Sequence, residues 1–215
     1  MPISLELIQQ KLNCRISTLD SGFDRHVVKR SHTRRLDRFA LQEGYVSALW
    51  QAWCAFCREL LICSAQGATT ARGAVIASPY TVHSEMEIAF IARQLANGNV
   101  VRTIRPLLGS HQEHTWGDLG KLNSVVSGLG CGNAPQVLTA LSACLRIEDL
   151  QLCRNASAHI GKSTIQEIKK ARVRYLDTRM QHPSDMMYWV DPGSSHFLWK
   201  SWIEEIELSS QLAVQ

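Results

Sequence analysis

The feature that most constrains the fold is a long stretch in which apolar side chains recur at helical spacing. Between Leu36 and Ala65 apolar residues recur three and four positions apart, at Leu36, Phe39, Ala40, Val46, Leu49, Trp50, Trp53, Phe56, Cys57, Leu60 and Leu61. This pattern predicts one long amphipathic helix. Its apolar stripe must be covered by other parts of the chain, so we expect the protein to be built around it.

Shorter helical patterns with recognisable ends occupy much of the remaining chain. Ser84 and Glu87 form a capping box at the start of one helix, and Gly98 ends it. Asn133 is expected to cap another helix, which has Pro135 in its first turn. Together the patterns predict helices over residues 5–16, 85–97, 116–126, 134–145, 147–160, 163–179 and 197–208.

Breaks rich in glycine, proline and small residues separate these helices. Residues 66–82 and 99–114 are expected to be long loops, with a short strand at 74–76 left open, and 127–133 a glycine-rich turn. No βαβ alternation and no internal repeat is visible. We therefore predict an all-α fold, an up-and-down helical bundle of five or more helices with long loops. Most tryptophans fall at helical spacing and are expected in the core rather than on a surface that stacks nucleic-acid bases.

Length and cysteine content narrow the class of protein further. A chain of 215 residues can bury a full core without disulfides or metals. We expect an N-terminal helix and basic connector over residues 1–35 and a main helical domain over 36–215. Seven irregularly spaced cysteines favour reduced thiols over a secreted disulfide framework. The start does not resemble a signal peptide, and no apolar run approaches the ~18 residues that span a bilayer. We expect a cytoplasmic protein with no membrane partner.

The positive charge of the chain is concentrated in one segment. Residues 24–38 carry six basic and two acidic side chains, a net charge of +4 that equals the net charge of the whole chain. Such a stripe attracts a phosphate backbone, which predicts an RNA-binding segment. The alternative is a solvated connector. The six basic residues are Arg25, Lys29, Arg30, Arg34, Arg35 and Arg38.

The polar stretch from Arg154 to His159 interrupts what would otherwise be a buried helix end. On a helix, Asn155 and His159 lie about 40° apart and share a face, and Arg154 can reach the same volume. A guanidinium fork suits two phosphate oxygens, and an imidazole can transfer protons near neutral pH. The set fits phosphodiester chemistry without a metal or another cofactor. Simple capping of the helix end is the alternative.

Arg154-Asn155-x-x-x-His159, near the end of the penultimate bundle helix, resembles the signature of the HEPN superfamily (higher eukaryotes and prokaryotes nucleotide-binding). Three other features fit the same family. They are a short helical stretch over 147–150 just before the signature, an early helix over 48–56, and a final helix containing Trp199 and Trp202. The resemblance spans about residues 36–208. It is closest to stand-alone ribonuclease members of bacterial defence and toxin loci, including the RiboL-PSP-HEPN group.

The resemblance implies a homodimer in which the two signature helices meet and form one cleft. It also implies metal-independent RNA cleavage that leaves a 2′,3′-cyclic phosphate and a 5′-OH. Carried over to this chain, His159 would transfer protons, Arg154 would hold the phosphate and Asn155 would position the histidine or the substrate. The protein would act as a toxin or antiviral effector, with an antitoxin or sensor protein as a further partner.

Two other readings of the same sequence stay open. A non-catalytic HEPN module would bind RNA or nucleotide, or serve assembly. A DNA-binding regulator would use the basic segment, although no confident helix-turn-helix pattern supports it.

Four further features of the sequence are weaker candidates for a functional site. Cys54-x-x-Cys57 lies inside the long helix without a second cysteine pair at zinc spacing, so core thiols are favoured. Residues 111–114, His-Gln-Glu-His, lack the spacing of a zinc protease helix and are expected in a polar loop that could line a cleft. Cys153, beside Arg154, could have a lowered thiol pKa. The glycines of 128–132 follow a helix and are assigned to a turn rather than to a phosphate loop.

Overall fold

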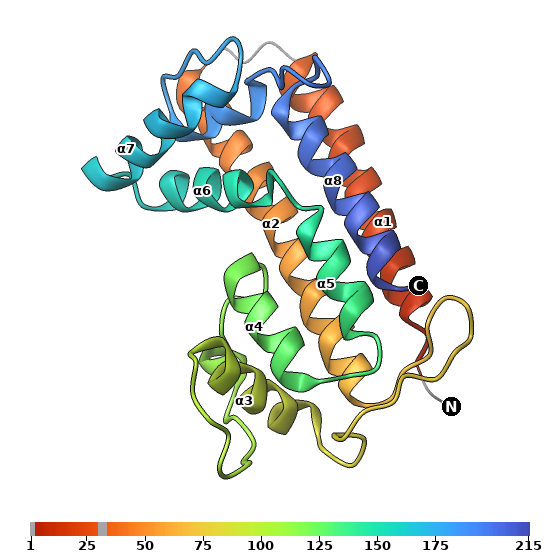
Figure 1. The fold of residues 1–215 in the computed structure, drawn as a ribbon. Helices are drawn as coiled ribbons and strands as arrows, with labels where there is room; N and C mark the ends of the chain where they lie inside the picture. The colour runs from red at the N-terminus through yellow and green to blue at the C-terminus, as the bar shows by residue number, and fades with distance from the viewer. Residues whose placement is uncertain (1–2, 30–33) are drawn as a thin grey trace. The chain divides into compact units, whose positions relative to one another are not determined.

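The computed structural model describes residues 3–29 and 34–215, and over these residues the protein is all-α, which confirms the predicted fold class. Figure 1 shows the helices in chain order. They are α1 (Leu5–Phe23), α2 (Arg35–Ala65), α3 (Glu85–Ala96), α4 (Leu119–Leu129), α5 (Ala134–Ser142), α6 (Ile147–Ala158), α7 (Lys162–Ala171) and α8 (Leu198–Ala213). A π-helical turn, Asp24–Val28, and 3₁₀ turns at Ser110–Gln112, Arg172–Arg174 and Pro183–Tyr188 complete the described elements.

Several predicted boundaries are confirmed and others change. The long helix α2 and the capping box of Ser84 and Glu87 are present. The first helix runs beyond residue 16 to Phe23, whereas α7 ends at Ala171 rather than near residue 179. Residues 74–76 form no strand, because Val75 makes only an isolated bridge to Thr69.

The chain packs as two compact units, each built from separated segments. Unit 1 contains Met1–Leu12, Trp53–Cys144 and Leu208–Gln215, and unit 2 contains Asn13–Ala52 and Leu145–Glu207. Helices α1, α2 and α8 therefore contribute residues to both units. This partition does not coincide with the division at residue 35 expected from the sequence.

Unit 1 has its core among the second half of α2 and the helices α3, α4 and α5. Helices α3 and α4 pack closely at Gly128, where a Cβ atom would lie 2.4 Å from Leu95 Cδ2. Gly130 then ends α4 in the left-handed conformation, with φ of +60°, which glycine adopts without strain. Gly128 therefore lies in α4, which runs past the predicted end at residue 126, and only Gly130 and Gly132 belong to the predicted turn.

Unit 2 is organised around aromatic packing. The Phe23 ring stacks on Trp199 at 4.9 Å between ring centroids, and Tyr45 meets Trp199 edge-on. The Trp199 Nε1–H donates to Asp20 at 3.0 Å. Over the whole chain all six tryptophans are at most 5% exposed, which confirms their predicted place in the core.

By length and composition α2 would qualify as a membrane-spanning helix. Half of its most apolar window is buried inside the protein. Core helices of globular proteins meet the same criterion, so this helix is weak evidence for a membrane segment.

The position of α6 depends on a buried carboxylate of α8. Glu205 Oε1 accepts hydrogen bonds from the backbone amides of Arg146, at 2.7 Å, and Ile147, at 3.1 Å. These amides begin α6 and have no partner within the helix. A carboxylate at a helix N-terminus also interacts favourably with the helix dipole. Glu205 is thus the N-terminal cap of α6, although it lies far away in the sequence.

Replacing Glu205 with alanine should destabilise unit 2, because two buried amides lose their acceptor. We expect a loss of about 1–3 kcal/mol in the free energy of unfolding, measured by urea denaturation. Glu205→Gln retains an acceptor oxygen and should lose less. Glu204→Ala, on the same helix but exposed, is the matched control and should stay within about 0.5 kcal/mol of the wild type. Equal stabilities for the two alanine variants would contradict the capping role.

Candidate functional site

The signature residues lie at the C-terminal end of α6. Arg154 and Asn155 are half-buried in the last turns, and Arg154 Nη1 donates to Asn155 Oδ1 at 3.1 Å. His159 follows the helix and is exposed, with φ of −135° and ψ of 72°. Within the described residues no hydrogen bond or ion pair engages its imidazole ring. The structure therefore brings Arg154 and Asn155 together and leaves His159 accessible beside them.

The prediction that Asn155 and His159 share a helical face is wrong in one respect. Helix α6 ends at Ala158, so His159 lies outside it. The His159 amide still donates to the Asn155 carbonyl at 2.9 Å. The chain then turns, and the Thr164 hydroxyl donates to the His159 carbonyl at 3.0 Å. This hydrogen bond and the turn at Gly161 start α7 and set the backbone of His159 outside the α-helical region.

The inner face of α6 holds the signature in place. Cys153 and Ala156 are fully buried, and α6 packs against the 3₁₀ turn Pro183–Tyr188. Burial raises the pKa of the Cys153 thiol well above its ordinary value. The thiol therefore stays protonated, and the lowered pKa that the neighbouring Arg154 suggested is wrong.

A buried carboxylate ties α6 to the segment after α7. Asp149 accepts hydrogen bonds from Arg174 and from the Tyr175 hydroxyl. Burial, together with the hydrogen bond to this carboxylate, raises the pKa of Tyr175. These contacts draw the chain back toward α6 at Tyr175, which accounts for the early end of α7.

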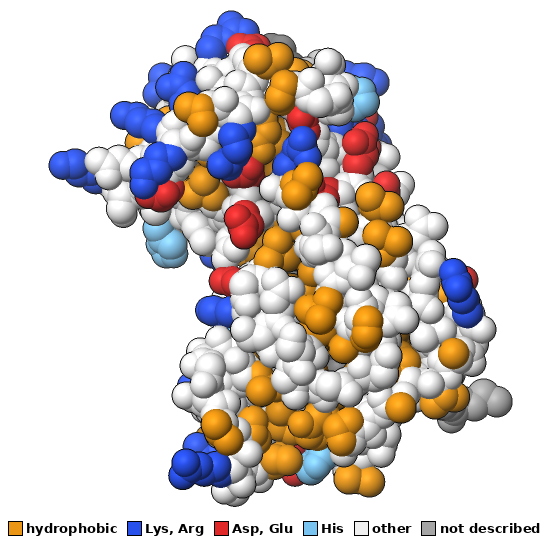
Figure 2. Space-filling view, in the orientation of Figure 1, with side chains coloured by type: hydrophobic (Ala, Val, Ile, Leu, Met, Phe, Trp, Pro, Cys, Tyr) orange, Lys and Arg blue, Asp and Glu red, His pale blue; other side chains and the backbone are white. Residues whose placement is uncertain are grey.

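A basic surface covers α7 and the segment that follows it. Residues 162–179 carry six basic and two acidic side chains, a net charge of +4. Figure 2 shows Lys and Arg side chains gathered over α7. Within the described residues, Lys162 and Lys169 are exposed and have no ion pair. Sequence reasoning missed this surface because it placed the whole charge excess in residues 24–38. The six basic residues, which we call the α7 surface, are Lys162, Lys169, Lys170, Arg172, Arg174 and Arg179.

The described parts of the predicted RNA-binding segment, residues 24–29 and 34–38, are largely helical. Arg25 and Lys29 lie in and just after the π-helical turn, and Arg34 is exposed just before α2. Arg35 and Arg38 belong to α2, where both guanidinium groups lie over the Phe39 ring. Arg38 is half-buried and also donates to Gln181 Oε1 at 3.3 Å. Arg30 lies outside the described residues. Arg25, Lys29, Arg34 and Arg35 are therefore the accessible cations of this segment.

A second polar constellation in unit 2 has the order of a hydrolase triad. Ser184 Oγ lies 2.8 Å from His182 Nδ1, and His182 Nε2 lies 3.1 Å from Glu43 Oε1. Ser184 is 0% exposed, however, and its hydroxyl donates to Gln42 Oε1 at 3.0 Å. A substrate cannot reach this serine, so the set fastens the 3₁₀ turn to α2.

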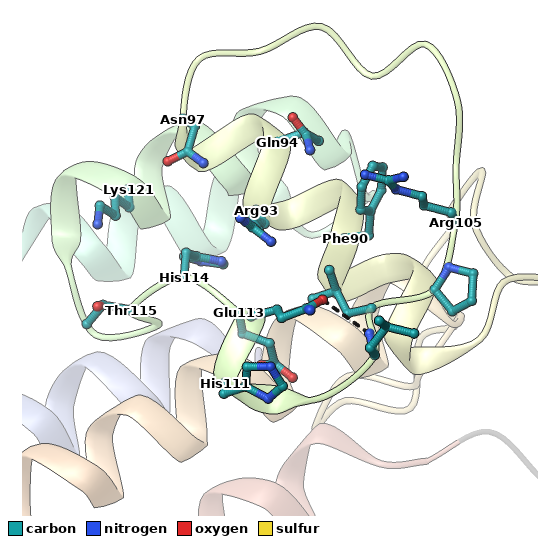
Figure 3. Close-up of a pocket in the computed structure, with 14 residues that line it drawn as sticks. Phe90, Arg93, Gln94, Asn97, Arg105, His111, Glu113, His114, Thr115 and Lys121 are labelled. Atoms are coloured by element: carbon teal, nitrogen blue, oxygen red, sulfur yellow. Dashed lines mark hydrogen bonds between the residues drawn. The ribbon is translucent and has the colours of Figure 1, made fainter.

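Unit 1 contains a polar cleft of about 780 Å³, drawn in Figure 3. Residues 111–114 line it, so the polar loop predicted there does border a cleft. The residues that line it are Phe90, Arg93, Gln94, Asn97, Arg105, Pro106, Leu107, Leu108, His111, Gln112, Glu113, His114, Thr115 and Lys121.

One ion pair holds the loop that forms this cleft. Arg58, on the second half of α2, contacts both carboxylate oxygens of Glu113 at 2.7 Å, and Trp116 Nε1–H donates to the same carboxylate at 2.5 Å. Burial opposes the charge of Glu113, but the hydrogen bonds from Arg58 and Trp116 outweigh it and lower its pKa. The carboxylate is therefore ionised and fully engaged at neutral pH.

His114 is the most perturbed histidine of the described chain. Burial, and then the charge of Lys121, lower its pKa to about 4. Both ring nitrogens are buried and have no hydrogen-bond partner. The imidazole is therefore neutral at physiological pH and presents one donor and one acceptor.

The cysteines are thiols, and the described residues contain no group of three or more His, Cys, Asp or Glu side chains placed to hold a metal ion. Burial, followed by the neighbouring Cys54 and Cys144, raises the pKa of Cys57. Cys57 thus lies in the core of unit 1, as predicted, whereas Cys54 is only half-buried.

Comparisons with protein-family models, curated proteins and solved structures return no match for this chain. The resemblance to HEPN proteins therefore rests on the signature residues at the end of α6.

The lowered pKa of His114 predicts a pH dependence of stability. In the unfolded chain the imidazole takes up a proton near pH 6.5, whereas in the folded protein it does so only near pH 4. The unfolding free energy should therefore fall as pH decreases from 6.5 to 4, because the unfolded state binds the proton first. His114→Asn should show a shallower fall in urea denaturation over this range. His196→Asn, an exposed control, should follow the wild type, and parallel curves for all three proteins would contradict the prediction.

Proposed function

We propose that this protein is a metal-independent endoribonuclease of the HEPN type. The observation that carries the proposal is the arrangement at the end of α6, where a hydrogen-bonded Arg154 and Asn155 adjoin an exposed His159. These three residues have the identities and order of the family signature. Helix α6 packs against α7, so the α7 surface adjoins the signature.

Each side chain has a role that its chemistry suits. The RNA 2′-OH attacks the adjacent phosphorus, and the bond from phosphorus to the 5′ oxygen breaks, which leaves a 2′,3′-cyclic phosphate and a 5′-OH. Arg154 binds non-bridging phosphate oxygens through its planar fork. His159 accepts the 2′-OH proton or donates a proton to the leaving 5′ oxygen. Asn155 orients Arg154 through their hydrogen bond.

Two proton carriers are needed, and each chain supplies one at this site. We assign the second role to the partner subunit's His159 in a homodimer. The apolar surface near the signature supports such contact, since Ile160, directly after His159, is 61% exposed. Val173 and Leu176, beyond α7, are also exposed apolar side chains.

The α7 surface and the accessible cations of residues 24–38 supply the charge that attracts an RNA backbone. Both belong to unit 2, as does the signature. In this proposal the protein acts as a cytoplasmic toxin or antiviral effector, and an antitoxin or sensor protein controls it.

The central prediction concerns His159. His159→Ala should remove nearly all cleavage of total RNA while preserving the fold, because loss of a general acid–base group lowers the rate by about 10²–10⁴-fold. Cleavage by the wild type should persist in EDTA and leave cyclic phosphate ends, detected by end-labelling and mass spectrometry. His196→Ala, an exposed histidine of unit 2, should cleave like the wild type.

Mixed dimers provide the control for the shared site. Dimers that pair wild-type and His159→Ala chains should lose most of the activity, since one proton carrier is missing. A fully active monomer in light scattering, or a strict magnesium requirement, would contradict the mechanism. RNA binding without any cleavage would favour the alternative, a non-catalytic HEPN module.

The basic surfaces predict how RNA binding responds to salt. Each phosphate neutralised on a single strand contributes about 0.7 to the slope of log K against log salt. Lys162→Glu with Lys169→Glu should weaken RNA binding and flatten this slope by about 1.4. Arg34→Glu with Arg35→Glu should act in the same direction, as measured by fluorescence anisotropy at three salt concentrations.

The matched control reverses two exposed cations of α1. Lys11→Glu with Arg15→Glu changes the total charge by the same amount without touching either surface. An equal loss of affinity in all three double variants would show that RNA affinity depends on the net charge of the chain and not on either surface. An unchanged slope for Arg34→Glu with Arg35→Glu would identify residues 24–38 as a solvated connector.

A further inference from the structure

The cleft of unit 1 gathers positive charge that the protein itself leaves unpaired. Arg93 comes from α3, Arg105 from the loop between α3 and α4, and Lys121 from the first turn of α4. Within the described residues none of the three forms an ion pair with a carboxylate. In Figure 3 Lys121 and Arg105 lie toward opposite ends of the drawn residues, and Arg93 lies between them.

The acid among the lining residues does not neutralise these cations. Glu113 is held by Arg58 through two contacts at 2.7 Å, and Trp116 donates to it as well. Its side chain is only 4% exposed. Three uncompensated cations therefore face a cleft whose carboxylate is already satisfied.

The cleft also holds polar groups without partners. Both ring nitrogens of His114 are buried and unpaired, although buried polar groups in folded proteins are nearly always hydrogen-bonded. Asn97 and Thr115 add exposed amide and hydroxyl groups at the rim. A ligand that carries negative charge would compensate the three cations, and its charge would lie beside the neutral imidazole.

Charge and volume identify the class of ligand. A cavity of about 780 Å³ falls within the range of roughly 300–1,000 Å³ that is typical of small-molecule sites. Guanidinium forks match paired phosphate oxygens, and a lysine is a common point charge for phosphate. A single-stranded nucleic acid would spread one charge per nucleotide along an extended groove, usually with exposed aromatic rings for stacking. Phe90, the aromatic side chain of the lining set apart from the histidines, is buried and covered by Arg105.

We propose that this cleft binds a small molecule that carries two or more adjacent phosphate groups, held by Arg93, Arg105 and Lys121 beside the His114 ring. The site is independent of the proposed ribonuclease chemistry, because its lining residues all belong to unit 1 and the signature belongs to unit 2. A nucleoside polyphosphate and an inorganic polyphosphate share this chemistry.

Isothermal titration calorimetry on the full chain tests the proposal, with tripolyphosphate, ATP, AMP and adenosine as probes. Tripolyphosphate and ATP should bind, AMP should bind more weakly and adenosine should not bind. Equal affinities for tripolyphosphate and ATP would show that the cleft recognises the phosphates alone. A higher affinity for ATP would show that the cleft also contacts the nucleoside. Arg93→Gln and Lys121→Gln should each weaken ATP binding about tenfold or more, because each removes a charge-assisted hydrogen bond.

Arg102→Gln is the matched control. Arg102 is exposed on the same loop but does not line the cleft, so this variant should bind ATP like the wild type. Arg105→Gln, at an exposed position, replaces either variant if circular dichroism shows that it fails to fold. His159→Ala should keep full ATP binding, which separates this proposal from the ribonuclease.

The imidazole of His114 gives a second readout. Bound phosphates place negative charge beside it, so its pKa should rise on addition of ATP in an NMR titration of the ring carbons. Arg93→Gln should remove this shift at the same ATP concentration.

Three results would overturn the proposal. The first is the absence of any binding of tripolyphosphate and ATP at millimolar concentration. The second is an unchanged ATP affinity when Arg93→Gln and Lys121→Gln are combined. The third is a short RNA oligonucleotide whose binding is weakened by Arg93→Gln while ATP does not bind, which would assign the cleft to RNA.

Discussion

The burial of α2 is the constraint on which the rest of the protein depends. This helix carries large apolar side chains along most of its length, so other elements must pack over these side chains to remove them from water. Leu49 and Trp50 enter the core of unit 2, and Trp53 and Phe56 enter the core of unit 1. Burial of such a side chain contributes about 1.5–3 kcal/mol. Each unit therefore forms around its own half of one helix.

The candidate catalytic end of α6 is held by buried charge as well as by apolar packing. Glu205 binds the first amides of the helix, and Asp149, in its first turn, binds Arg174 and Tyr175. A buried carboxylate is unfavourable unless hydrogen bonds satisfy it, so each of these groups requires its partners in place. The helix that these contacts hold ends beside the exposed His159.

The two units present positive charge in different forms. The α7 surface consists of long basic side chains that are all exposed, which suits the backbone of a polymer. The cleft of unit 1 is concave, and its loop is fixed by the pair of Arg58 and Glu113, which suits a small ligand with dense charge. Neither the net charge of the chain nor the count of basic residues distinguishes the two. The distinction comes from the loop that encloses the cleft. Within the described residues the cleft cations form no ion pair, whereas half of the cations of the α7 surface pair with carboxylates.

The sequence by itself determined what depends on local signals. The periodicity of residues 36–65 predicted α2, the pair Ser84 and Glu87 predicted the start of α3, and the glycines after residue 127 predicted a turn. It also identified Arg154, Asn155 and His159 as neighbours at a helix end, because all three lie within one and a half turns. These features arise from contacts over a few residues, which the order of side chains largely specifies.

Only the tertiary structure decided what depends on partners distant in the chain. The sequence placed the end of α7 near residue 179, but the burial of Tyr175 against Asp149 ends the helix at Ala171. The thiol of Cys153 is inert because the core surrounds it, whatever residue stands beside it in the sequence. The loop that forms the cleft of unit 1 is held by the ion pair between Arg58 and Glu113, which lie 55 residues apart in the sequence. Such contacts involve segments whose approach no local pattern encodes, since they depend on how whole helices pack.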